Sequence, residues 1–301
     1  MRKSVKDLVC QTITLEYNLP HDGYKIPNSK LTNFKDSCFE RDEDITLSKI
    51  IYNNIIEFSL SEDEIDYNNL STEQMRVLGS YLRYNEDASE QTKIKYGFYG
   101  EVLLYSILYC KFGSDVLISK GYFYSPLERG EAKGYDVFHI IDNNGSLEFW
   151  FGEAKFYKDI NKPIKDILNG IEFSLSDEYL NRNLIAIFKQ KHYITNGSDL
   201  IESLINKWKK NPYINLAEEL NKNDMTLVYP IFISYEKKAS LNYHENIKRC
   251  INFINKTYEE LDIEVKSSMK LKIFFILLPV ENVKEIKRQV VEWISKKEPL
   301  I

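Results

Sequence analysis

Strand-like apolar runs and helix-like apolar spacing alternate along most of the chain. Runs typical of strands cover residues 116–124, 135–141, 147–156, 226–235 and 271–278. Apolar positions spaced for helices cover residues 88–110, 164–171 with an extension towards 208, 247–254 and 283–294. The order helix, three strands, helix, strand, with additions, predicts an α/β fold.

The first ninety residues follow a different pattern. Residues 10–17 alternate like a strand, and the acid-rich residues 36–66 contain the apolar spacing of an amphipathic helix. Ser71 with Gln74 has the spacing of a capping box, which predicts another helix start. We therefore expect an acidic accessory region at residues 1–90 and a second domain at residues 91–301. The acidity is read either as a solvated face or as a binding surface.

Composition excludes several classes of protein. Hydrophobic residues make up 43% and charged residues 28%, which is typical of a soluble globular protein. The longest apolar run, residues 273–280, is far shorter than the roughly 20 residues of a membrane-spanning helix. The 4 cysteines are scattered without a CxxC pair, which favours a reducing cytoplasm over zinc or disulfide frameworks. A net charge of −5 requires any nucleic-acid contact to come from local patches.

Two carboxylates lie on a predicted hairpin. Asn144-Gly145 between two apolar runs is the strongest short signal for a two-residue hairpin turn. A turn at these residues sets Asp136 directly opposite Glu153, and opposed Cβ atoms lie roughly 4.5–5.5 Å apart. Oxygen ligands at this spacing suit a shared Mg²⁺ or Mn²⁺ ion.

Lys155 lies two residues beyond Glu153 and therefore on the same face of its strand. There it could orient a water molecule or stabilise charge on a phosphate. The Glu-x-Lys pattern recurs elsewhere in the chain, but only at Glu153 does an acid lie opposite. The rival Glu236 is separated from the nearest upstream acid, Asp224, by the length of a strand. The alternative for Asp136 and Glu153 is a chance acid pair neutralised by Lys155.

Glu101 supplies a third carboxylate from the preceding helix. It shares one helical stripe with Gly97, Leu104 and Leu108, so it points with core-facing residues. A buried Glu is rare unless it is paired or binds a metal. The alternative is a first-turn Glu that the helix macrodipole favours.

Several segments resemble known nucleases. A helical Glu followed by Asp and Glu-x-Lys on adjacent strands resembles the PD-(D/E)xK nuclease superfamily, with Tyr135 where that motif has Pro. The longer strings resemble the HamA family, the nuclease subunits of Hachiman bacterial anti-phage defence systems, over about residues 95–175. These strings are Gly100-Glu101-Val102-Leu103-Leu104-Tyr105, Ser119-Lys120-Gly121-Tyr122, Gly134-Tyr135-Asp136-Val137-Phe138-His139 and Phe149-Trp150-Phe151-Gly152-Glu153-Ala154-Lys155-Phe156-Tyr157.

The resemblance implies a restriction-endonuclease-like core with an N-terminal α+β region and C-terminal additions. It implies a metal-dependent DNA nuclease encoded with a superfamily 2 helicase, HamB, that controls it. Asp136, Glu153, the Ala154 carbonyl and Glu101 would then bind Mg²⁺ or Mn²⁺, and Lys155 would assist the attacking water. The metal would activate that water and neutralise the phosphate.

Other charged residues have open interpretations. Lys120 could contact a phosphate or be a solvated strand lysine, and we interpret His139 as a core histidine opposite Trp150. Two basic clusters could follow a DNA backbone or be solvated helix faces. They are Lys189, Lys191, Lys207, Lys209 and Lys210, and Lys284, Lys287, Arg288, Lys296 and Lys297.

Two other functions compete with the controlled nuclease. The chain could be a catalytically silent DNA-binding or scaffold subunit of the helicase complex, or a stand-alone restriction-type endonuclease. The sequence has no Walker loop, so any ATP hydrolysis would belong to the partner.

Overall fold

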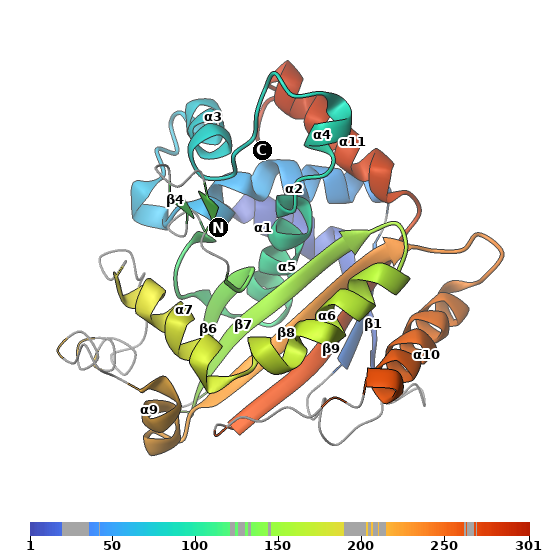
Figure 1. Cartoon of the computed structure of the whole chain (residues 1–301). Coiled ribbons are helices and arrows are strands. Elements are labelled where there is room, and N and C mark those ends of the chain that lie inside the picture. The colour runs from blue at the N-terminus through green and yellow to red at the C-terminus, as the bar shows by residue number, and fades with distance from the viewer. Residues whose placement is uncertain are drawn as a thin grey trace.

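The computed structural model describes residues 1–19, 36–41, 43–120, 124–125, 130–131, 134–143, 146–189, 203, 206, 210, 215–261, 263, 268 and 270–301. Within these residues, helices cover both faces of one seven-stranded sheet, so the fold has three layers (Figure 1). The predicted α/β class is confirmed. No helix in this part of the chain is long and apolar enough to cross a membrane.

The sheet is parallel in its middle and antiparallel at both edges. Its strands follow the order β1 (Ile13–Leu19), β2 (Asp36–Arg41), β9 (Lys270–Val280), β8 (Thr226–Glu236), β7 (Ser146–Tyr157), β6 (Val137–Asn143) and β3 (Asp115–Val116). Strands β2, β9, β8 and β7 pair in parallel, whereas β1, β6 and β3 pair antiparallel. Because β8 and β9 are covered on both faces, they are apolar almost throughout.

Each face of the sheet carries its own core. One core packs the sheet against α6 (Asn161–Ser174), α7 (Asp177–Lys189), α9 (Leu216–Lys222) and α10 (Tyr243–Leu261). The other packs it against α1 (Lys3–Thr12), α2 (Asp44–Ser59), α3 (Leu70–Ser80), α5 (Phe98–Lys111) and α11 (Val283–Lys296). Figure 1 shows α6 in front of the sheet and α5 behind it. Short elements complete the fold: η1 (Glu62–Glu64), α4 (Glu90–Lys93) and a separate pair of strands, β4 (Tyr124–Ser125) and β5 (Gly130–Glu131).

Most predicted elements are confirmed, but the strand predicted at residues 116–124 is wrong. Strand β3 ends at Val116, and residues 117–120 are outside any strand. Leu117 and Ile118 are both buried, and the Leu117 amide donates to the Phe138 carbonyl at 2.9 Å. The apolar run therefore reflects consecutive burial rather than strand alternation.

Two predictions in the first ninety residues need correction. Helix α1 runs to Thr12 before β1 begins, so residues 10–12 are helical rather than extended. The N-cap of α3 is Asn69 rather than Ser71, and the Gln74 side chain donates to the Tyr52 carbonyl at 2.8 Å. The division near residue 90 stays a prediction. Strands β1 and β2 join the same sheet as β9.

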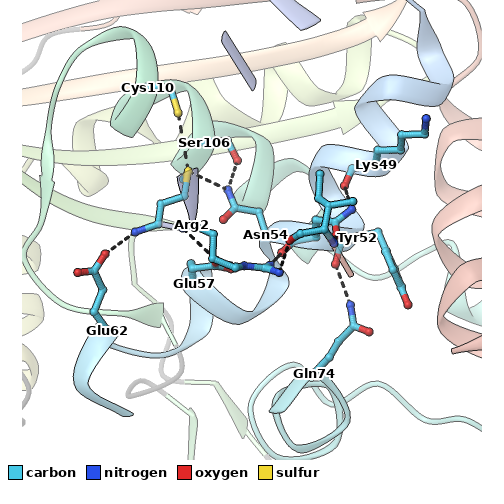
Figure 2. Close-up of polar contacts among 12 residues, drawn as sticks. Arg2, Lys49, Tyr52, Asn54, Glu57, Glu62, Gln74, Ser106 and Cys110 are labelled. Atoms are coloured by element: carbon cyan, nitrogen blue, oxygen red, sulfur yellow. Dashed lines mark hydrogen bonds and ion pairs between the residues drawn. The ribbon is translucent and has the colours of Figure 1, made fainter. Parts of the chain in front are cut away.

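Helix α2 confirms the helix predicted in the acid-rich segment, and it is buried from Ile50 to Ser59. Figure 2 shows polar contacts between this helix and its neighbours. The Asn54 side chain donates to Ser106 Oγ of α5 at 2.6 Å, and Arg2 donates to Glu57. α2 is therefore an internal element rather than a solvated one.

Candidate active site

The β6–β7 hairpin carries the predicted carboxylate pair. Its register runs from Val137 opposite Gly152 to Asn143 opposite Ser146, which confirms the predicted register and the two-residue connection. The turn residues, 144–145, lie outside the described residues. At the other end the register shifts by one residue, because the Asp136 amide donates to the Gly152 carbonyl at 2.8 Å. The extrapolated register predicts that Asp136 pairs directly with Glu153. The one-residue shift means that it does not.

The Asp136 side chain still binds β7 beside Glu153. Its Oδ2 atom accepts a hydrogen bond from the Ala154 amide at 2.7 Å. Burial is the largest cause that raises the pKa of Asp136 well above its ordinary value, and repulsion from Glu153 and Glu101 raises it further. The fold therefore brings the three predicted carboxylates within electrostatic reach of one another.

Lys155 pairs with the neighbouring carboxylate. Its ammonium donates to Glu153 Oε1, and both side chains are about one-fifth exposed, at 20% and 24%. Burial opposes the charge on Lys155, but attraction to Glu153 and Asp136 outweighs it and raises the pKa of the ammonium. Lys155 therefore keeps its positive charge beside the two acids at neutral pH.

Lys120 and Glu101 close the other side of the site. The Lys120 ammonium lies 3.8 Å from Glu101 Oε2 and 4.0 Å from Asp136 Oδ1. It also donates to the Tyr135 carbonyl at 2.8 Å, and its side chain is only 7% exposed. The interpretation of Lys120 as a solvated strand lysine is therefore wrong, because it is buried between α5 and the hairpin and lies outside any strand.

Two glycines allow α5 to approach the site. A Cβ at Gly152 would lie 2.8 Å from Pro230 Cγ and 3.2 Å from Leu104 Cδ2. A Cβ at Gly100 would lie 3.0 Å from Phe156 Cβ. The helix that carries Glu101 therefore packs against β7 at a distance that larger residues would prevent.

Tyr135 contributes in a way that the sequence did not indicate. Its carbonyl accepts from Lys120, and its buried ring packs edge-on against Phe138 and Tyr229. Its hydroxyl donates to the Ser174 carbonyl at the end of α6. An aromatic residue directly before the motif Asp was the only available signal. Tyr135 anchors the start of β6 where the superfamily motif has Pro.

His139 and the described residues of the second basic cluster have structural surroundings of their own. His139 pairs with Trp150 as predicted, it is buried, and burial lowers its pKa to about 3, which fits a core histidine. Of the second basic cluster, Lys287 is largely buried, while Arg288 and Lys296 pair with Glu residues of α11. Lys191, Lys207 and Lys209 of the first cluster lie outside the described residues.

The site suits a divalent cation in donor type and charge. Carboxylate oxygens are the ligands that Mg²⁺ and Mn²⁺ prefer, and a cation would relieve the repulsion that raises the pKa of Asp136. Across the part of the chain that the structure describes, no three His, Cys, Asp or Glu side chains form a group that could hold a metal. Lys120 supplies positive charge between Asp136 and Glu101.

One comparison with known proteins matches nearly the whole chain. The family model described as HamA matches residues 11–294. Neither a curated protein nor a solved structure matches the chain at a significant level.

Proposed function

The chain belongs to the HamA family, a component of Hachiman anti-phage defence, and from this premise we propose that it is a metal-dependent deoxyribonuclease. One observation supports this most strongly. The partly buried Asp136 has its pKa raised by desolvation and by Glu153 and Glu101, while Lys155 stays charged beside them. Clustered acids with a charged lysine are typical of sites that hydrolyse phosphodiesters with a metal.

In this proposal Asp136 and Glu153, with Glu101 and the Ala154 carbonyl, hold Mg²⁺ or Mn²⁺. A bound cation supplies the charge that polarises water and neutralises a phosphate. Lys155 holds positive charge and a hydrogen-bond donor at the same edge, where it orients a water molecule. Lys120 lies between Glu101 and Asp136 and would contact a DNA phosphate.

The proposal extends to the partner and to the organisation of the chain. A superfamily 2 helicase, HamB, would control access to DNA and supply ATP hydrolysis. Residues 91–301 would form the restriction-endonuclease-like unit, and the acidic residues 1–90 would dock the helicase or mimic DNA. The setting would be the bacterial cytoplasm.

A specific observation favours a second function. Among the described residues no complete metal-ligand group is assembled. A catalytically silent DNA-binding or scaffold subunit of the helicase complex would need no such group.

DNA cleavage separates the two functions. Plasmid and linear DNA are incubated with Mg²⁺ and one of three proteins, namely wild type, Glu153→Gln or Lys155→Ala. Each protein is tested by itself and together with the helicase and ATP. We expect cleavage to fall about 100-fold or more in both variants, because each removes a group that acts on the reacting phosphate. EDTA should abolish cleavage.

The rival Glu-x-Lys motif supplies matched controls. Glu236→Gln and Lys238→Ala change the same residue types at the end of β8 and should cleave like wild type. Full cleavage by Glu153→Gln and Lys155→Ala would show that these residues are not the site. No cleavage by wild type with the helicase bound would favour the scaffold.

A further inference from the structure

A cavity opens beside Glu101, one of the three carboxylates. It has a volume of about 230 Å³, and Glu101 and Lys120 form part of its lining. The rest of the wall includes the aromatic side chains Tyr81, Tyr96 and Phe98. The cavity therefore shares Glu101 and Lys120 with the proposed site and joins an aromatic wall to charged groups.

Neighbouring residues hold the aromatic wall in place. The ring of Phe98 stacks on Tyr99 at 4.1 Å between centroids, and the ring of Tyr96 lies 6.4 Å from Phe98. The Asn85 amide donates to the Tyr96 hydroxyl at 3.3 Å. Tyr96 is half-buried, so it is both fixed and accessible.

Arg83 contributes a cation to the same cavity. It is exposed and has a φ of +53°, in the left-handed region that non-glycine residues rarely adopt. The turn around it is held by bonds from the Leu82 amide to the Val77 carbonyl at 3.1 Å and from the Tyr84 amide to the Leu78 carbonyl at 2.9 Å. These bonds therefore fix the backbone position from which the Arg83 side chain extends.

Gly97 leaves room in the cavity wall beside Glu101. A Cβ at this position would lie 3.1 Å from Glu101 Oε1. Any side chain here would therefore crowd the carboxylate that lines the cavity. Gly97 gives a ligand in the cavity access to Glu101.

We propose that this cavity binds one unpaired nucleotide of a DNA strand next to the phosphate to be cleaved. The base stacks on Tyr96 and Tyr81, and Arg83 contacts the backbone phosphate, because stacking and cationic contacts together are how proteins bind single strands. The volume is below the roughly 300–1,000 Å³ of pockets for drug-sized ligands, which suits a single base. In a duplex the bases are stacked inside and cannot reach the wall. This inference rests on the proposed function and gives it a substrate class, single-stranded or frayed DNA.

Equilibrium binding tests the cavity without cleavage. Full-length protein carrying Glu153→Gln is titrated with fluorescent single-stranded oligothymidylate and with a duplex, in EDTA, and anisotropy is measured. We expect tighter binding of the single strand. Tyr96→Ala should weaken it about 5- to 100-fold, as expected for loss of one stacked base. Arg83→Asn, which tolerates the left-handed backbone, should weaken it and reduce the salt dependence.

Conservative and remote variants control for folding. Tyr96→Phe keeps the ring and should bind like the parent protein, and Tyr67→Ala removes an exposed tyrosine that is outside this cavity wall. Unchanged single-strand binding by Tyr96→Ala and Arg83→Asn, or tighter binding of the duplex, would overturn the proposal. If thymidine monophosphate displaced the fluorescent oligothymidylate as effectively as an unlabelled oligothymidylate does, the assignment of the cavity to a DNA strand would be overturned.

The cleavage assay and the binding assay test separate claims, so either claim can be rejected without the other. Tyr96-dependent binding by a protein that never cleaves DNA would support the cavity and reject the nuclease. Cleavage of DNA by a protein whose binding ignores Tyr96 would do the reverse.

Discussion

Gly152 is a residue at which β7 is packed closely against its neighbours. A Cβ there would lie 2.8 Å from Pro230 Cγ and 2.9 Å from the Pro230 carbonyl oxygen. The carbonyl is part of β8 and cannot rotate away. We expect Gly152→Ala to lower the free energy of unfolding by about 1–3 kcal/mol, the usual cost of overpacking a core. Urea unfolding measures this change.

Gly170 provides the matched control for Gly152. It lies in α6, and no atom lies within 4 Å of the position that an alanine methyl group would occupy there. Gly170→Ala should therefore raise the free energy of unfolding by about 0.5–1 kcal/mol, because alanine favours the helix. Equal stability of Gly152→Ala and wild type would contradict the close contact between β7 and β8.

At the residue scale, the sequence indicated which residues form the candidate site better than it indicated the contacts that surround them. Asp136, Glu153 and Lys155 could be selected because period-two alternation and the hairpin register depend only on local sequence. The shift at Asp136 could not be predicted, since it accompanies the bond from the Ala154 amide to the Asp136 carboxylate. The burial of Lys120 depends on α5 and the hairpin meeting in space.

At the scale of elements, α11 contacts the end of β7 through a partly buried lysine. Lys287 Nζ donates to the Phe156 carbonyl at 3.1 Å and lies 5.3 Å, 5.2 Å and 5.8 Å from the ring centroids of Tyr99, Phe156 and Tyr157. Burial lowers the pKa of Lys287 from 10.5 to about 8. Desolvation of the ammonium therefore outweighs its contacts with the rings and the carbonyl.

The lowered pKa of Lys287 predicts a pH dependence of stability. Between pH 8 and 10.5 the unfolded chain keeps a proton that the folded protein has released. The free energy of unfolding therefore gains a contribution that rises with pH across this window, by about 3 kcal/mol. Lys287→Met should lack that contribution, as measured by urea unfolding at several pH values.

Lys284→Met is the control for this pH dependence, because Lys284 is exposed on the same helix. It should follow wild type, including the titration of tyrosines that both proteins share. Parallel pH profiles for wild type and Lys287→Met would mean that the Lys287 ammonium is better solvated than its position indicates.

Elements defined by long local patterns were predictable, and those defined by distant pairing were not. Strands β8 and β9 have long apolar runs because the sheet buries them on both faces. Strand β2 lies in an acid-rich segment and pairs with β9 from near the other end of the chain. No local period indicates such a pairing.

At the scale of the whole molecule, the early part of the chain completes the sheet and one of its two cores. Strands β1 and β2 extend the sheet beyond β9, and α2 packs between α5 and α11. The sequence separated residues 1–90 by charge and composition, which carry no information about contacts with distant elements. The α/β class followed from the order of elements, whereas the joining of the two regions in one sheet depends on tertiary packing.

Arg2 links three distant parts of this assembly, and its removal should destabilise the whole chain. Its Nε lies 2.5 Å from Glu57 Oε1, and its Nη1 donates to the Ile301 carbonyl at 2.6 Å. The Glu57 side chain is only 2% exposed, so Arg2→Ala would leave a buried carboxylate without this partner. We expect the free energy of unfolding, measured in urea, to fall by about 3–5 kcal/mol, and to fall less when Glu57→Leu accompanies Arg2→Leu.

Lys3→Ala, at an exposed neighbouring position, is the control and should match wild type. If Arg2→Ala also matched wild type, Glu57 would have to be solvated, and α2 would not be the internal helix that joins both ends of the fold.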